Sequence, residues 1–114
     1  MKTDHVVTAL SALAQDSRLA IFRALVQAGS AGLSAGRIGE ATGIAPSSVS
    51  FHMKELTRAD MVASRQDGRF VIYTANFATM NALIAFLTEN CCGGAPCVPA
   101  CIPACPATEQ GSAQ

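Results

Sequence analysis

The feature that most constrains the fold is a single change of hydrophobic period in a chain otherwise patterned for helices. Near residue 61 the pattern becomes that of strands, and Asp67-Gly68 lies between the β-prone runs 61–63 and 70–74. Asp and Gly tolerate the positive φ of a type I′ turn, so this pair strongly indicates a β-hairpin. Elsewhere, apolar residues recur every three or four positions, as in amphipathic helices. The sequence therefore predicts a mainly α-helical chain with one β-hairpin.

Four helices are predicted before the hairpin. Asp16 is expected to cap the second by accepting a backbone N–H, and Gly29 is expected to end it. Ser34 should cap a short third helix that ends at Gly43, and Pro46 should open the fourth. The residues predicted to be buried are Val6, Leu10 and Leu13 in the first helix, Leu19, Phe22, Leu25 and Val26 in the second, Leu33 before the third, and Val49, Met53 and Leu56 in the fourth.

The fourth helix, from Ser47 to about Ala59, is predicted to bury only a narrow apolar stripe. A short helix, a turn and a second helix with an exposed polar face form a helix-turn-helix. The hairpin that follows, with Arg65 and Arg69 at its tip, then corresponds to the wing of a winged-helix domain. The exposed face of the fourth helix is predicted to consist of Ser47, Phe51, Lys54 and Arg58.

The last predicted helix, 77–90, is apolar nearly all round. A helix of this kind at the edge of so small a domain usually packs against a second copy of the chain. We therefore expect a homodimer formed through the first and last helices. Residues 1–90 would form the winged helix-turn-helix and dimerisation domain, and residues 91–114 would form a Cys/Pro-rich tail.

Composition argues against several classes of protein. Eight basic and eight acidic residues give zero net charge, so any nucleic-acid contact must come from local placement. No apolar run approaches the roughly twenty residues of a transmembrane helix, and the start lacks the long apolar stretch of a secretion signal. We therefore expect a cytoplasmic protein. Two histidines without a paired acid and base leave no catalytic constellation, so an enzyme is not expected.

Several motifs carry a resemblance to a known family. They are Leu13-Ala14-Gln15-Asp16-Ser17-Arg18-Leu19, Ser47-Ser48-Val49-Ser50-Phe51-His52-Met53-Lys54-Glu55-Leu56, Asp67-Gly68-Arg69 and Tyr73. With this order of elements, the chain resembles the ArsR/SmtB family of metal-responsive bacterial repressors over residues 5–90. The resemblance implies a homodimeric winged helix that binds operator DNA when empty and releases it when its ligand binds.

The resemblance also implies the DNA contacts. Phe51 on the fourth helix could contact a thymine methyl group in the major groove. Arg58, Arg65 and Arg69 would meet phosphates, which position a protein more than they specify a sequence. His52 lies towards the buried edge, so a packing role is expected for it. The residues expected to face the major groove are Ser47, Ser48, Ser50, Phe51 and Lys54.

All five cysteines lie within residues 91–105, and residues 1–90 contain none. An intracellular cluster of this kind is more often a soft-metal or metalloid site than a disulfide framework. Trivalent arsenic binds three thiolates, and adjacent Cys91 and Cys92 could supply two because Gly93-Gly94 lets the backbone bend. The third could be Cys97 or, at a loop-entropy cost only a few tenths of a kcal/mol higher, Cys101.

The resemblance to the family narrows the choice of thiol ligands. Many members carry a cysteine pair at the start of the third helix, and zinc-sensing members carry Asp and His ligands on the last helix. Here residues 33–37 hold no thiol, and residues 77–90 hold neither Asp nor His. A subset of arsenic-responsive members begins a thiol site with two adjacent cysteines where the last helix ends, and residues 90–97 are similar to it. The resemblance implies Cys91, Cys92 and Cys97 as ligands, which leaves Cys101 as the substitute and Cys105 without a firm role.

Other interpretations of the thiols stay open. They could hold zinc or an iron–sulfur cluster, form a disulfide redox switch, or be incidental in a disordered tail. A thiol metal carrier is a function of a different class, although a carrier needs neither a helix-turn-helix nor a basic wing. The sequence as a whole predicts an arsenic(III)-responsive repressor without an organic cofactor, and antimony(III) is a second candidate inducer. A zinc- or redox-responsive repressor of the same fold is the alternative.

Overall fold

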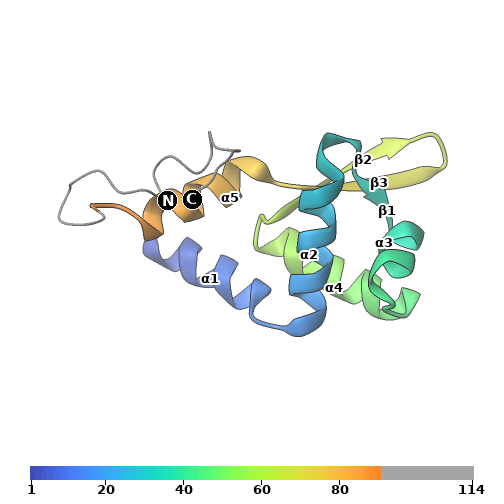
Figure 1. Ribbon diagram of the computed structural model, residues 1–114, viewed down its shortest axis with the longest axis horizontal. Helices are drawn as coiled ribbons and strands as arrows, with labels where there is room; N and C mark the ends of the chain where they lie inside the picture. The colour runs from blue at the N-terminus through green and yellow to red at the C-terminus, as the bar shows by residue number, and fades with distance from the viewer. Residues whose placement is uncertain (91–114) are drawn as a thin grey trace, which may run out of the picture. The chain divides into compact units, whose positions relative to one another are not determined.

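The structure, a computed structural model, describes residues 1–90 of the 114-residue chain (Figure 1). The elements follow in the order α1 (Thr3–Leu13), α2 (Asp16–Ala28), the 3₁₀ helix η1 (Gly29–Ala31), β1 (Leu33–Ser34), α3 (Ala35–Thr42), α4 (Pro46–Arg58), β2 (Val62–Asp67), β3 (Phe70–Ala75) and α5 (Phe77–Leu87). The predicted mainly α-helical chain with a β-hairpin is confirmed. The cysteines lie outside the described residues.

Strands β2 and β3 form the predicted hairpin, which Figure 1 shows extending away from α2, α3 and α4. Asp67 pairs with Phe70, so the turn consists of Gly68 and Arg69. Of these two, only Gly68 has a positive φ, at 62°. The predicted type I′ turn is therefore wrong in detail, because that type needs positive φ at both central residues.

A third strand was not predicted from the sequence. The two residues of β1 pair antiparallel with β3, Leu33 opposite Tyr73, and the sheet has the order β1-β3-β2. Gly32, directly before β1, has φ +68°, and a Cβ atom there would lie 2.5 Å from the carbonyl oxygen of Tyr73. Only glycine permits so close an approach of the two backbones. A two-residue strand has no detectable period, so the sequence gives no signal for it.

The core of the described part joins α2, α3 and α4 to the beginning of the sheet. Its largest fully buried side chains are Ile21, Leu25, Ile38, Val49, Leu56 and Met61. Burial of Val6, Phe22, Leu25, Val49, Met53 and Leu56 was predicted and is confirmed, whereas Leu13, Val26 and Leu33 are only half-buried. Because α4 buries only Val49, His52, Met53 and Leu56, the rest of that helix is left for other contacts.

Three predictions in the first two helices are wrong. Leu10 and Leu19 are 40% and 45% exposed, because α1 buries Ala9 and Ala12 while α2 buries Ile21. Helical spacing allows more than one face, and the partner surface selects among them. Asp16 is the first residue of α2 and not its cap. The cap is Gln15, whose side-chain oxygen accepts the backbone N–H of Arg18 at 3.0 Å.

Helix α5 ends at Leu87, three residues before the predicted end. It buries Thr79 and Leu83, while Ile84 and Leu87 are 49% and 59% exposed. Met1–Ile84 form one compact unit, and a second unit starts at Ala85. The predicted division after residue 90 stays a prediction. None of the helices within residues 1–90 is long and apolar enough to cross a membrane.

Candidate nucleic-acid interface

A short turn with local hydrogen bonds joins α3 to α4. Ser34 caps α3 as predicted, its hydroxyl oxygen accepting the backbone N–H of Arg37 at 3.3 Å. Gly43 ends α3 in the left-handed conformation. The Thr42 hydroxyl donates to the carbonyl oxygen of Ile38 at 2.7 Å and accepts the N–H of Ile44 at 3.3 Å. This arrangement is a helix-turn-helix, with α4 as its second helix.

The polar face of α4 is open to solvent as predicted. Phe51 is 57% exposed, and its ring meets the ring of His52 edge to face, with centroids 5.5 Å apart. The other exposed residues of this face are Ser47, Ser48, Ser50, Lys54, Thr57 and Arg58. One helix face thus offers hydroxyls, a cation and an apolar ring, which are the groups that read base edges and thymine methyls in a major groove.

The basic residues near this face differ in their ion-pair and hydrogen-bond partners. Arg58 lies 3.4 Å from the Glu55 carboxylate. The Arg65 guanidinium donates to the carbonyl oxygens of Ser30 at 3.2 Å and Ala31 at 3.1 Å, so it ties the hairpin to η1. Within residues 1–90, Lys54 and Arg69 have no carboxylate partner, because the ion pairs there are Arg58–Glu55 and Arg37–Glu40.

His52 is 8% exposed on the inner side of α4, which agrees with its predicted packing role, and it also has a polar partner. Arg18 donates through Nε to the carbonyl oxygen of Ala12 at 2.7 Å, and its Nη1 lies 3.4 Å from Nδ1 of His52. A guanidinium has donors only, so Nδ1 of His52 is the acceptor. Arg18 therefore links the end of α1 to the middle of α4, a role that was not predicted although the residue lies in one of the family-like motifs.

A second polar cluster joins the end of α4 to the start of α5. Asp60, at φ +64°, accepts from the Asn76 amide at 3.3 Å and from the Thr79 hydroxyl at 3.2 Å. The Asn76 side-chain oxygen accepts the backbone N–H of Thr79 at 3.2 Å, which caps α5. The sequence offered only a weak signal for this cluster, an Asn directly before an apolar helix.

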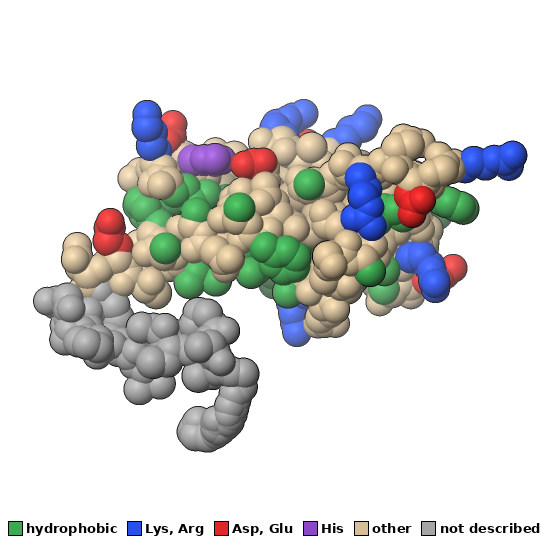
Figure 2. All heavy atoms as spheres, turned by 90° about the horizontal axis from the view of Figure 1, so that it is seen from above, with side chains coloured by type: hydrophobic (Ala, Val, Ile, Leu, Met, Phe, Trp, Pro, Cys, Tyr) green, Lys and Arg blue, Asp and Glu red, His purple; other side chains and the backbone are tan. Residues whose placement is uncertain are grey.

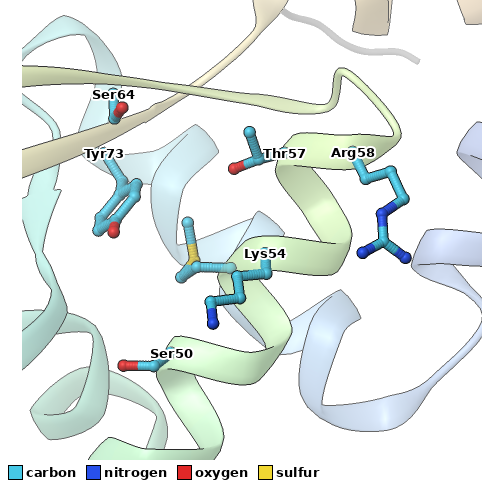
Figure 3. A pocket seen from close by; sticks show the side chains of 7 residues that line it. Ser50, Lys54, Thr57, Arg58, Ser64 and Tyr73 are labelled. Atoms are coloured by element: carbon cyan, nitrogen blue, oxygen red, sulfur yellow. The ribbon is translucent and has the colours of Figure 1, made fainter.

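A pocket of about 530 Å³ lies between α4 and the hairpin (Figure 3). Helix α4 contributes Ser50, Lys54 and Thr57, and the paired strands contribute Ser64 and Tyr73. Figure 3 shows Lys54 and Tyr73 pointing into the same space beside α4, whereas Arg58 at the rim points to the other side of the helix. Thr57, Ser64 and Tyr73 were not among the predicted DNA-contacting residues.

On the face shown in Figure 2, Lys and Arg side chains project separately, and acidic side chains lie beside several of them. The described part also contains no group of three or more His, Cys, Asp or Glu side chains placed to hold a metal ion.

A family model described as a helix-turn-helix domain matches residues 13–65. The chain is 43% identical over 58 residues to the uncharacterized HTH-type transcriptional regulator YceK of Bacillus subtilis (strain 168), a match that covers 51% of this chain and 57% of YceK. It is 29% identical over 89 residues to the HTH-type transcriptional regulator YgaV of Escherichia coli (strain K12), covering 78% of this chain and 88% of YgaV.

Solved structures share the fold. An ArsR-like transcriptional regulator from Rhodococcus sp. RHA1 superposes with a TM-score of 0.68 at 23% identity, covering 75% of this chain and 78% of its own. The homodimeric winged helix-turn-helix DNA-binding domain of Mb0332 from Mycobacterium bovis, a possible ArsR-family regulator, has a TM-score of 0.60 at 27% identity, covering 76% and 81%.

Residues 13–65 of this chain therefore form a helix-turn-helix domain similar to those of the matched transcriptional regulators, and the fold is the winged helix predicted from the sequence. Its neighbours among solved structures include an ArsR-like regulator and a possible ArsR-family regulator. The matched proteins are regulators and not enzymes, in agreement with the prediction.

Proposed function

We propose that the protein is an arsenic(III)-responsive repressor that binds operator DNA as a homodimer and releases it when trivalent arsenic binds C-terminal thiols. The observation that carries the proposal is the segregation of the cysteines. All five fall within residues 91–105, while residues 1–90 hold no cysteine and no group of three metal-ligating side chains. The proposed ligands are Cys91, Cys92 and Cys97, with Cys101 as the substitute. Antimony(III), which has similar chemistry, is a second inducer of the same site.

The DNA-binding half of the proposal is supported by α4. Its exposed face carries groups suited to base edges, and the hairpin beside it ends in Arg69, which has no ion pair within residues 1–90. With zero net charge, the protein cannot rely on a general field. The proposed contacts are therefore local: Ser47, Ser48, Ser50, Phe51 and Lys54 to the major groove, and Arg58, Arg65 and Arg69 to phosphates.

The proposed dimer is supported by apolar residues left at the surface of both terminal helices. Val7 and Leu10 on α1 are 55% and 40% exposed, and Leu87 on α5 is 59% exposed. Large apolar side chains gathered on one element are commonly covered by a partner. A dimer is also what a helix-turn-helix needs to read two half-sites about 34–36 Å apart.

The chemistry of arsenic binding favours a mechanical release of DNA. Neutral arsenous acid and three protonated thiols give a neutral tris-thiolate complex and three water molecules, so the charge of the protein does not change. Three thiolates are the donor set that soft trivalent arsenic prefers. Binding would instead constrain the chain directly after α5, and a coupling of about 1–3 kcal/mol between the two sites is sufficient for an allosteric switch.

The test is a DNA-release titration with arsenite on five separate Cys→Ser variants, using DNA from the protein's own promoter. Cys91→Ser, Cys92→Ser and Cys97→Ser should bind DNA normally and lose at least about tenfold in arsenite sensitivity. Cys105→Ser, the matched control, should respond as wild type. Release by zinc but not by arsenite would contradict the choice of ligand, and failure of the wild type to bind promoter DNA would exclude the repressor.

A further inference from the structure

We infer that the pocket between α4 and the hairpin binds a backbone phosphate of DNA, with Lys54 and Tyr73 as its principal contacts. The inference rests on the proposed DNA-binding function and refines it, because it assigns Lys54 and Ser50, at the edge of the major-groove face of α4, to a phosphate and not to bases. The observation behind it is a concentration of unused hydrogen-bonding groups in one concave place. Four hydroxyls, those of Ser50, Thr57, Ser64 and Tyr73, line the same pocket of about 530 Å³ as the Lys54 ammonium.

None of these five polar groups has a partner within residues 1–90. The side-chain hydrogen bonds of that part involve other residues, and its ion pairs are Arg58–Glu55 and Arg37–Glu40. Ser and Thr on a helix often bond back to the carbonyl four residues earlier, as Thr42 does to Ile38, but Ser50 and Thr57 do not. Their hydroxyls are therefore available to a ligand.

The chemistry of the lining selects an anion with several acceptor oxygens. No carboxylate lines the pocket, and its only inward-pointing cation is Lys54, because Arg58 turns away and pairs with Glu55 (Figure 3). Met53, nearly fully buried, closes the side next to the core. One ammonium with several neutral donors matches the single charge of a phosphodiester, and hydroxyls and lysines are common phosphate contacts in protein–DNA complexes.

The position of the pocket selects DNA as the source of that phosphate. The outer face of α4, with Ser47 and Phe51, would face the major groove, and the pocket lies on the flank of this helix next to the hairpin. A duplex whose major groove receives α4 has a sugar–phosphate strand at each edge of that groove. In such a complex the strand on the hairpin side would pass over the pocket, and one of its phosphates would enter between Lys54 and Tyr73.

The inference is tested by DNA affinity as a function of salt for Lys54→Met and Tyr73→Phe, on promoter DNA and on a random duplex. Lys54→Met should reduce the slope of log K against log salt by about 1.8 for a homodimer, about 0.9 for each lost phosphate contact, equally on both duplexes. Tyr73→Phe keeps the charge, so it should lose about tenfold in affinity with an unchanged slope. Arg23→Met, which removes an exposed charge on α2, is the matched control and should leave the slope unchanged.

A second measurement identifies the phosphate directly. Promoter duplexes carrying one neutral methylphosphonate at a time should show one position in each half-site where wild-type affinity falls and Lys54→Met affinity does not. Thermal unfolding of each variant should match the wild type, which separates lost contacts from lost folding.

Three results would overturn the inference while leaving the proposed function standing. The first is wild-type affinity in Tyr73→Phe. The second is a loss of affinity on methylphosphonate substitution that is as large in Lys54→Met as in the wild type at every position, as expected if the pocket binds a free small anion. The third is an equal slope change in Arg23→Met, which would assign the effect to net charge. If the wild type binds no DNA, the proposed function and the inference fall together.

Discussion

Arg18 shows how one side chain can fix the position of a DNA-reading helix without contacting DNA. It bonds the carbonyl oxygen of Ala12 at the end of α1 and Nδ1 of the buried His52 on α4. Both acceptors are part-buried, so neither is easily satisfied by water once the guanidinium is gone. Leaving a buried acceptor unpaired costs about 1–3 kcal/mol.

Arg18→Met should therefore lower the free energy of unfolding by about 1–3 kcal/mol, measured by urea denaturation. Arg23→Met on the exposed side of the same helix is the control and should change it by less than about 0.5 kcal/mol. Equal losses in the two variants would show that the Arg18 bonds do not contribute to stability.

Single residues also mark the limits of sequence reasoning. Ser34, Gly29 and Gly43 were assigned correctly because a cap or a left-handed residue acts on backbone groups within a few positions. The bond of Arg65 to the carbonyls of Ser30 and Ala31 spans more than thirty positions and was not foreseen. Its predicted phosphate contact stays a prediction, and these bonds would compete with it.

At the scale of elements, the Asp60–Asn76–Thr79 cluster connects the end of α4 to the beginning of α5. Asn76 has two roles there, because its amide donates to Asp60 and its oxygen caps α5. Under the proposed function this is a short polar route between the helix that reads DNA and the helix that precedes the thiols. We expect the hydrogen bonds of this cluster to affect both the stability of the fold and the coupling between the thiols and the DNA-binding helix.

Asn76→Ala should lower the free energy of unfolding by about 1 kcal/mol, the usual cost of losing a side-chain cap. It should also reduce the factor by which arsenite weakens DNA binding. Asn81→Ala, an exposed position inside α5, is the control and should leave both unchanged. Thermal unfolding measures the free energy of unfolding, and DNA titrations with and without arsenite measure the factor by which arsenite weakens binding. A normal arsenite response in Asn76→Ala would exclude the cluster from the coupling.

The hydrophobic pattern predicted the buried face of a helix correctly only where the apolar residues form a single stripe. In α4 the apolar residues form one narrow stripe, and Val49, Met53 and Leu56 are buried as predicted. In α1 and α2 apolar residues occur on several faces, and the structure buries Ala9, Ala12 and Ile21 where Leu10 and Leu19 were predicted. A helical period defines candidate faces, whereas the neighbouring elements decide which is covered.

At the scale of the whole molecule, the exposed leucines allow the proposed homodimer interface to be tested. Leu10 on α1 is 40% exposed and would be covered in the proposed homodimer. Leu10→Glu should shift the protein to monomers in sedimentation at micromolar concentration and abolish operator binding, because two half-sites need two copies. Leu19→Glu is the matched control: Leu19 is 45% exposed but lies on α2, so this variant should stay dimeric. Dimers in both variants would place the interface elsewhere.

Sequence alone determined the order of the elements, the hairpin, most of the caps and the concentration of thiols after residue 90, because these depend on periodicity, local hydrogen bonding and composition. Tertiary structure alone decided which faces of α1 and α2 are buried, the pairing of β1 with β3, the bonds of Arg18, Arg65 and Asp60, and the pocket that brings Lys54 to Tyr73. Each of these joins segments distant in the chain, and such contacts are fixed by packing in three dimensions, on which a local pattern carries no information.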